Sequence, residues 1–477
     1  LFFLSNYFET QSTFKFLTMK KHHFIFASSF VFTLLFYNQS VGLNLAIFGL
    51  FLTAMIVYFF KNQFANKSHW WLVFTSVLSC LSFAWYGDFA SFLALFLSVI
   101  MLQFRTQLVE LKLIQLFPLI VVNGFASLGR PFLFGQWLPK RELKNDFAKK
   151  LIAYVIIPLV FLLLFFVVYS FGSDHFSALF TDCTLDLDIF ELLLIVLIGF
   201  YISFSFWNYW VPDMSYELNE KLANDFVIAE EVNQPTFSFL DLDFERKSGE
   251  ITLLLLNVML FVFIVTYNYE QFFEVTASSS LSKATHERVN AVIFSTIMAV
   301  GVLLFYFKGG FNFDKKAINL KRLAKIWIVL NSVLIISTFI KNSEYVAFFG
   351  LTYKRLGVYA FLILAFIGLG YTFIKIIRQK TNAYIFNKMA WYFYGTILLC
   401  ACINWGNIIT IYNISVGKGV EPTFLCSLNF NDEARENYFL ANKINAPEQY
   451  SYRQGFIHQQ KKESFLSKVL YYEFIKD

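Results

Sequence analysis

Long apolar stretches separated by short charged segments constrain this chain more than any other feature. Twelve such stretches occur, near residues 22–39, 42–60, 70–86, 88–104, 112–127, 150–171, 189–208, 251–268, 289–307, 323–340, 356–376 and 389–412. A helix of roughly 18 to 20 apolar residues crosses about 30 Å of hydrocarbon and satisfies its own backbone hydrogen bonds there. The sequence therefore predicts an all-α, polytopic transmembrane helix bundle of about eleven or twelve spans.

The composition agrees with a membrane environment. Hydrophobic residues make up 57% of the chain and charged residues 15%, whereas soluble domains carry roughly 25% charged residues. The net charge of +6 comes from Lys and Arg that gather between the apolar stretches, which is typical of membrane orientation. We therefore expect the lipid bilayer, and no nucleic acid, as the partner of this charge.

The chain divides by composition into three parts. Residues 1–18 precede Met19-Lys20-Lys21 and are predicted to be a non-native or disordered N-terminal extension. Residues 19–412 form the predicted transmembrane bundle, which includes a long loop over residues 209–250. Residues 413–477 are predicted to be a short polar, partly helical tail, with helices near 431–442 and 462–475.

Three basic segments, around Lys140, Lys316 and Lys380, indicate the orientation of the bundle. Even numbers of apolar stretches separate them, so all three fall on one side, which the positive-inside rule assigns to the cytoplasm. This predicts a multi-pass protein of the cell inner membrane with a cytoplasmic 209–250 loop. Five stretches precede Arg130, and this odd number leaves the side of the N-terminus open.

The segment between two late apolar stretches is the main candidate site. Thr352 is placed to cap the following helix, and Lys354 and Arg355 then occupy its first turn. The helix dipole disfavours cations there. One hypothesis is an outward-facing polar site around Arg355 that holds an anionic group. The alternative, which we favour, is an interfacial ion pair with one of three acids on the same predicted side, Glu344, Glu274 and Glu287.

Other polar groups lie inside the apolar stretches. Asn331, Thr338 and Lys341 share one face of a predicted helix. Asn404 and Asn407 are three residues apart in the last stretch, where a broken helix with a polar midpoint would suit a substrate. Hydrogen bonding between packed helices explains the same residues more simply.

Catalytic and cofactor motifs are missing from the sequence. There is no phosphate-binding glycine loop, no His-Glu-x-x-His and no nucleophile elbow, and the six His are scattered over loops and stretch ends. We therefore expect no metal and no cofactor, and an enzyme is the function class with least support. The hypotheses are binding or transport of a small solute, ion or lipid headgroup at a polar pocket, or a membrane scaffold or sensor component that acts through its loop and tail.

Several short motifs carry a family resemblance. They are Gly350-Leu351-Thr352-x-x-Arg355 between two stretches, Tyr37-x-Gln39-x-x-Gly42-Leu43-Asn44 near the start, and Ile403-Asn404-Trp405 in the last stretch. In these motifs the chain resembles bacterial multi-pass membrane proteins of the domain-of-unknown-function 4153/4173 type. The resemblance covers most of residues 22–412 and implies a multi-pass membrane fold, with no activity to carry over.

Overall fold

The computed structural model describes residues 21–65, 67–107, 111–138, 154, 157–173, 188–226, 239, 241–273, 281–444 and 447–475. Within these residues the regular elements are helices, and the β pairing is limited to an isolated bridge between Asp225 and Lys380. The predicted all-α class is confirmed. The expected extension over residues 1–18 and the basic segment near Lys140 lie outside the described residues.

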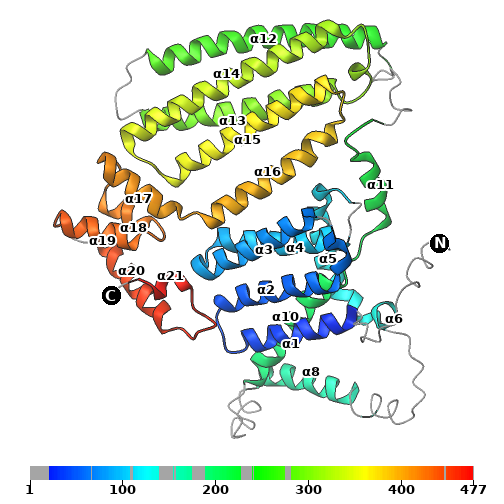
Figure 1. Ribbon diagram of the computed structural model, residues 1–477, viewed down its shortest axis with the longest axis vertical. Coiled ribbons are helices and arrows are strands. Elements are labelled where there is room, and N and C mark those ends of the chain that lie inside the picture. Colours follow the sequence, from blue (N-terminus) through cyan, green and yellow to red (C-terminus); the bar gives the residue numbers. More distant parts are fainter. Residues whose placement is uncertain are drawn as a thin grey trace. The chain divides into compact units, whose positions relative to one another are not determined.

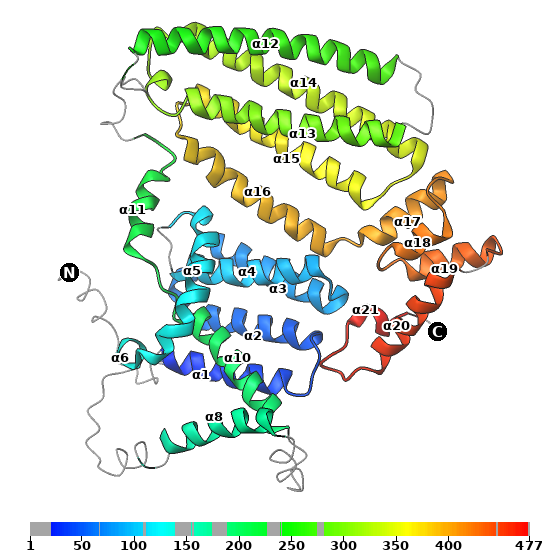
Figure 2. The same cartoon turned by 180° about the vertical axis from the view of Figure 1, so that it is seen from behind.

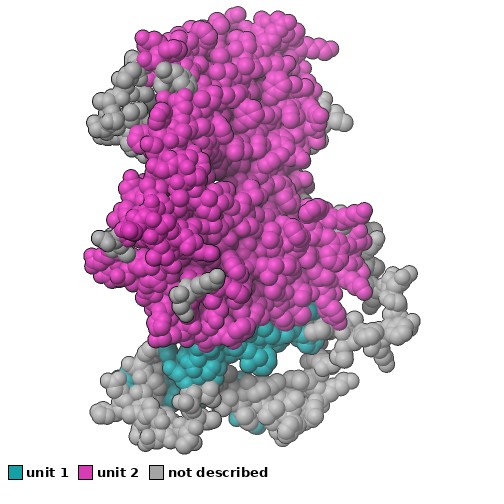
Figure 3. Space-filling model, turned by 60° about the vertical axis from the view of Figure 1, so that its left-hand side comes forward, with its two compact units in different colours: residues 1–40, 118–211 teal, residues 41–117, 212–477 magenta. Residues whose placement is uncertain are grey.

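Two compact units make up the chain, and Figure 3 colours them separately. The first comprises residues 1–40 and 118–211, and the second comprises residues 41–117 and 212–477. The helices of the first unit are α1 (Lys21–Phe36), most of α5 (Leu116–Gly129), η4 (Arg130–Phe132), α6 (Phe134–Trp137), α8 (Ile157–Gly172) and α10 (Ile189–Trp207).

Helices α1 and α10 form the main packing of the first unit. Gly199 lets them approach closely, since a Cβ atom at this position would lie 2.8 Å from the Phe32 ring. The buried Trp207 Nε1 donates a hydrogen bond to Ser28 Oγ at 2.8 Å. The pair is therefore held by close apolar contact and one internal polar link.

The second unit begins with three packed helices, α2 (Leu43–Phe59), α3 (Lys67–Tyr86) and α4 (Phe89–Gln107). A tight turn joins the last two, as the adjoining predicted stretches 70–86 and 88–104 require. Gly87 has a φ of +59°, and Asp88 Oδ1 accepts a hydrogen bond from the Ser91 amide at 2.9 Å. The left-handed backbone at Gly87 favours glycine because it has no Cβ atom. Further along the pair, Ser76 Oγ donates to the Ser98 carbonyl at 3.1 Å.

Five long helices follow, with the short α11 (Asp213–Lys221) before them. They are α12 (Leu242–Phe272), α13 (Leu281–Tyr306), α14 (Ile318–Phe349), α15 (Tyr353–Ile377) and α16 (Asn382–Cys402). Helix α14 is central: it packs against α12, α13 and α15, and α16 joins α15 to α4 (Figures 1 and 2). Buried aliphatic residues such as Leu320, Leu334 and Leu369 form their core.

Helix α12 begins nine residues earlier than the predicted stretch at 251, and ion pairing explains the difference. Arg246 Nη1 lies 2.8 Å from the buried Asp314 Oδ2, and Arg246 also pairs with Asp243 one turn away. These charged residues extend the helix into the 209–250 segment because their side chains find partners beside it.

The C-terminal segment folds into a group of short helices that we call the cap. It comprises α17 (Trp405–Val416), α18 (Pro422–Ser427), α19 (Asp432–Ala441), α20 (Glu448–Lys462) and α21 (Leu470–Glu473) (Figure 1). The helix expected at 431–442 is α19. The one expected at 462–475 is restricted to the four residues of α21, and α20 precedes it.

The cap also completes the start of α2. The amides of Leu43 and Asn44 donate to the Lys468 and Leu466 carbonyls, each at 2.9 Å. First-turn amides of a helix have no partner within the helix, so the cap supplies the partners here. Gly42 is required at this contact, because a Cβ atom would overlap the Ser467 carbonyl.

Six described helices are long and apolar enough to cross a membrane, and the bent pair α16 and α17 makes a seventh. Shorter apolar helices are Lys21–Phe36, Leu43–Phe59 and Asn290–Tyr306. Large apolar side chains cover exposed faces, for example Leu255 and Met259 on α12. An exposed apolar surface of this extent suits lipid, and the chain is a multi-pass membrane protein. The larger number of eleven or twelve spans stays a prediction, as does the inner membrane.

Candidate functional site

The turn between α14 and α15 begins at Gly350, which ends α14 with a φ of +83°. A Cβ atom at this position would lie 2.7 Å from the Lys418 carbonyl oxygen and 2.8 Å from Asn413 Oδ1. Both the backbone conformation and the close approach of α17 therefore demand glycine.

Asn413 of α17 holds the next residue of the turn. Its side chain is fully buried; Oδ1 accepts from the Leu351 amide at 2.6 Å, and Nδ2 donates to the Leu351 carbonyl at 3.1 Å. One asparagine thus satisfies both backbone groups of a buried residue outside any helix, which would otherwise be costly. These contacts with α17 explain why Gly350 and Leu351 stand together in the Gly-Leu-Thr-x-x-Arg motif.

Thr352 and Arg355 complete the turn. Thr352 Oγ1 accepts from the Arg355 amide at 3.3 Å, so the predicted cap of α15 is present. The half-buried Arg355 side chain folds back, donates to the Gly350 carbonyl and lies over the Tyr345 ring with Cζ 4.3 Å from the centroid. The arginine is therefore held against the turn by a carbonyl and an aromatic face.

The favoured ion pair at Arg355 is not found among the described residues. Glu344 Oε2 instead lies 3.2 Å from Lys341 Nζ, one turn away on α14. Lys354 is exposed. Glu274 and the side chain of Glu287, the other two acids considered for Arg355, lie outside the described residues. The pairing differs from the expectation because residues three apart on one helix already face each other.

The remaining predicted residues lie elsewhere. Asn331 is fully buried in the middle of α14, where Nδ2 donates to the Trp327 carbonyl at 2.8 Å. Asn404 lies at the break between α16 and α17, which bends by 68°, so the broken helix that was considered as an alternative is present. Its Oδ1 caps α17 through the Asn407 amide at 3.0 Å, and Nδ2 donates to the Phe430 carbonyl at 2.9 Å. These contacts are those of packing and capping.

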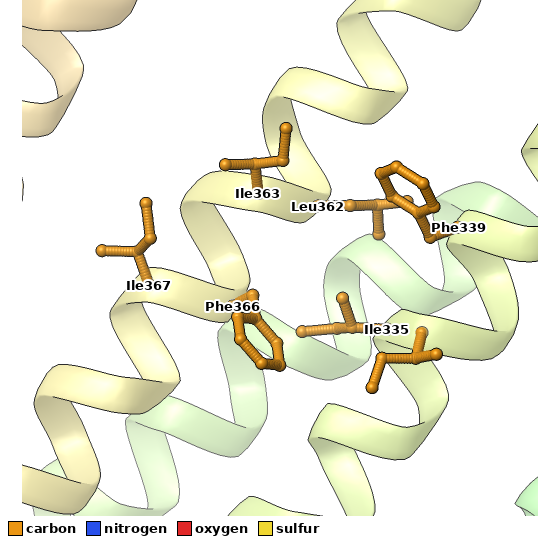
Figure 4. A pocket seen from close by; sticks show the side chains of 7 residues that line it. Ile335, Phe339, Leu362, Ile363, Phe366 and Ile367 are labelled. Carbon is orange, nitrogen blue, oxygen red and sulfur yellow. The ribbon is translucent and has the colours of Figure 1, made fainter.

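An apolar groove of about 260 Å³ lies between α14 and α15, and Figure 4 shows the side chains that line it. Its lining is entirely hydrocarbon: Ile335, Ile336, Phe339, Leu362, Ile363, Phe366 and Ile367. The groove opens outward, since Ile363 is 51% exposed and Phe366 48%. Nothing in the sequence motifs marks this groove, because it forms only where two helices with many exposed apolar residues pack side by side.

Polar groups mark the end of the groove nearer the turn. Tyr359 lies one turn before the groove residues of α15, and its ring centroid is 4.8 Å from that of Phe339. Its hydroxyl donates to Ser343 Oγ at 2.8 Å. Arg355, Tyr359, Leu362 and Phe366 recur every three or four residues and so share one face of α15. The face changes from apolar to cationic along its length.

A second polar cluster, which the sequence reasoning missed, lies inside the cap. The fully buried Asp432 accepts hydrogen bonds from Arg435 Nη2 at 2.7 Å and from Tyr471 Oη at 3.2 Å. Arg453 binds it through two nitrogens, Nε at 3.1 Å and Nη2 at 3.0 Å. One carboxylate therefore joins α19, α20 and the segment around α21.

The electrostatics of this cluster follow from its burial and pairing. Burial alone would raise the pKa of Asp432, but the hydrogen bonds and charges of Arg453 and Arg435 hold that pKa below its usual range. Burial and the Asp432 carboxylate raise the pKa of Tyr471, which keeps its proton as a donor. Only the Asp-x-x-Arg spacing of Asp432 and Arg435 was visible in the sequence, since Arg453 and Tyr471 come from distant positions.

The described residues contain no group of three His, Cys, Asp or Glu side chains that would hold a metal ion.

A family model matches residues 47–435, and its description is Domain of unknown function (DUF4153). No curated protein and no solved structure matches the chain. The match ends at Arg435 and covers the α14–α15 turn, the groove and the start of the cap.

Proposed function

The chain belongs to the DUF4153 family, and from that premise we propose that this multi-pass membrane protein binds a membrane lipid along the α14–α15 hairpin. The observation that carries the proposal is the outward-facing groove, whose lining side chains are all hydrocarbon. A small polar solute finds no hydrogen-bonding partner on such a lining, whereas an acyl chain gains dispersion contacts with it.

The residues considered for a polar pocket support this choice of ligand. Asn331 bonds to a carbonyl of its own helix, and Asn404 bonds to α17 and to the Phe430 carbonyl. Neither side chain contributes to the groove lining. Of the predicted site residues on α15, Arg355 is the one that recurs at helical spacing with the groove residues Leu362 and Phe366.

Filling the groove tests the proposal. Ile363→Trp places an indole in the groove mouth, and we expect lipid retained by the purified protein, counted by native mass spectrometry, to fall about fivefold, equivalent to about 1 kcal/mol. The matched control is Ile377→Trp, because Ile377 lies on the same helix outside the groove and is 54% exposed against 51% for Ile363. Equal retention by the two variants would contradict lipid binding in the groove.

A scaffold function is the second candidate, and the surface of the cap favours it. Tyr452, Phe465 and Phe474 are 73%, 69% and 70% exposed on the cap. Exposed aromatic residues of this kind are enriched at protein interfaces and at the membrane surface. The test compares cells that carry each variant with cells that lack the protein. If substitution of these three aromatic residues by Ala reproduces the loss of the protein while Ile363→Trp has no effect, the scaffold function replaces lipid binding.

A further inference from the structure

Within the part of the chain that the structure describes, Arg355 leaves most of its hydrogen-bond donors unused. A guanidinium has five N–H donors, and among the described residues Arg355 uses one of them, toward the Gly350 carbonyl. Tyr345 covers one face of the guanidinium at 4.3 Å, and Phe349 lies 6.0 Å away. Stacking of this kind fixes the plane of the group while leaving its edge free for a ligand.

The charge around the turn is strongly positive. Lys354 is exposed beside Arg355, and the exposed Lys418 belongs to the segment whose backbone packs on Gly350. Glu344, the acid in this region of α14, forms an ion pair with Lys341, with Oε2 3.2 Å from Nζ. Lys354 and Arg355 also lie in the first turn of α15, where the helix dipole opposes positive charge and favours an anion. An anionic ligand would offset both effects.

The distance between Arg355 and the groove suits a lipid. Arg355 precedes Leu362 by seven residues, or two helical turns, and Leu362 lines the groove. At about 1.5 Å per residue, this spacing corresponds to roughly 10 Å along the helix axis. Tyr359, whose ring packs on Phe339, fills the position between them. A lipid with its chain in the groove would bring its headgroup close to the turn.

We infer that Arg355 binds the phosphate of an anionic glycerophospholipid whose acyl chain lies in the α14–α15 groove. The inference rests on the proposed lipid binding and adds the class of lipid. The planar guanidinium matches two phosphate oxygens, and the nearby Lys354 and Lys418 favour a headgroup without a compensating ammonium. A zwitterionic lipid would fill the groove equally well, but its ammonium group would lie among the positive charges of Arg355, Lys354 and Lys418.

A competition experiment tests the class of lipid. The full-length protein is exchanged into nanodiscs with equal amounts of phosphatidylglycerol and phosphatidylcholine, and native mass spectrometry measures the lipids that remain bound. We expect the parent protein to be enriched about fivefold or more in phosphatidylglycerol. Arg355→Gln is expected to bring this ratio close to one while the total amount of bound lipid persists.

The controls separate this inference from the proposed function. Lys462→Gln removes the same formal charge from an exposed residue at the end of α20 and is expected to keep the enrichment. Ile363→Trp is expected to lower the total amount of bound lipid of both classes. Unchanged total lipid in this variant would contradict binding in the groove, whereas the ratio of the two lipids tests the choice of headgroup. Unchanged enrichment in Arg355→Gln would overturn the headgroup assignment. Inorganic phosphate at millimolar concentration is added in a parallel arm, and loss of enrichment without loss of lipid there would assign the site to free phosphate instead.

Arg355 also contacts the Gly350 carbonyl, so a folding check accompanies the experiment. Arg355→Lys keeps the charge and a donor for that carbonyl but loses the planar fork. We expect it to melt close to the parent and to show reduced enrichment. Enrichment equal to the parent in this variant would also overturn the assignment, because a point charge would then suffice.

Discussion

Arg355 in the α14–α15 turn and Arg453 in the cap occupy opposite environments, although both lie beside aromatic rings. Arg453 binds both oxygens of the fully buried Asp432, within a cluster that also contains Arg435 and Tyr471. Arg355 is half-buried, and among the described residues no carboxylate pairs with it. The comparison shows which charge is committed to the fold and which remains available to a ligand.

The energetic consequence follows from desolvation. A buried ion pair contributes little net stability compared with apolar residues, but removing one partner is costly because the other charge stays buried and unpaired. The Asp432 cluster should therefore be intolerant of single substitutions. The available charge of Arg355 should tolerate substitution much better, since solvent reaches it and its loss leaves no buried charge unpaired.

The largest expected effect comes from Asp432→Asn, which removes the charge that pairs with Arg435 and Arg453. Loss of the carboxylate charge leaves the fully buried Arg435 with Glu436 at 3.8 Å and takes the paired carboxylate from the half-buried Arg453, so we expect about 3–5 kcal/mol of destabilisation. The measurement is thermal unfolding in detergent together with proteolysis of the cap. Glu433→Gln, the exposed neighbour on α19, is the matched control. If both variants melt alike, the cluster does not hold the cap.

A smaller effect is expected from Asn413→Ala, which sharpens the comparison by loosening the turn that carries Arg355. The substitution leaves the Leu351 amide and carbonyl buried without their partner, and we expect a loss of about 2–4 kcal/mol. Denaturation in detergent gives the value. The exposed Asn437 provides a control substitution to Ala, which should change stability by no more than about 0.5 kcal/mol. A silent Asn413→Ala would mean that α17 does not support the turn.

The smallest expected effect is the response of the cap to mild acid. The pKa of Asp432 in the folded protein lies below its ordinary value, so its contribution is complete above the unfolded value of about 3.9 and is lost only as pH falls through the folded pKa. The melting temperature of the cap should therefore not fall between pH 7 and about pH 5 on account of this group. A drop in this interval that Asp432→Asn removes would contradict the assigned direction.

The membrane class, the helical stretches and the turn at Gly87 could all be predicted from sequence because they depend on local pattern. The hydrogen bond by which Thr352 closes the N-terminus of α15 was likewise predictable, because Thr352 directly precedes an apolar stretch. The partner of Glu344 could not be predicted from sequence, since the choice between Lys341 and Arg355 depends on how the Arg355 side chain folds back toward Gly350. The roles of Gly350 and Gly42 also depend on segments far away in the chain.

Sequence alone determined that this protein is an all-helical, multi-pass membrane protein, because long apolar stretches must satisfy their backbone amides internally in lipid. Tertiary structure decided the apolar groove between α14 and α15, the hold of Asn413 on Leu351 and the cluster around Asp432. The physical reason is that helix formation depends on neighbours a few residues away. The environment of a charge depends on which distant side chains packing brings within hydrogen-bonding distance.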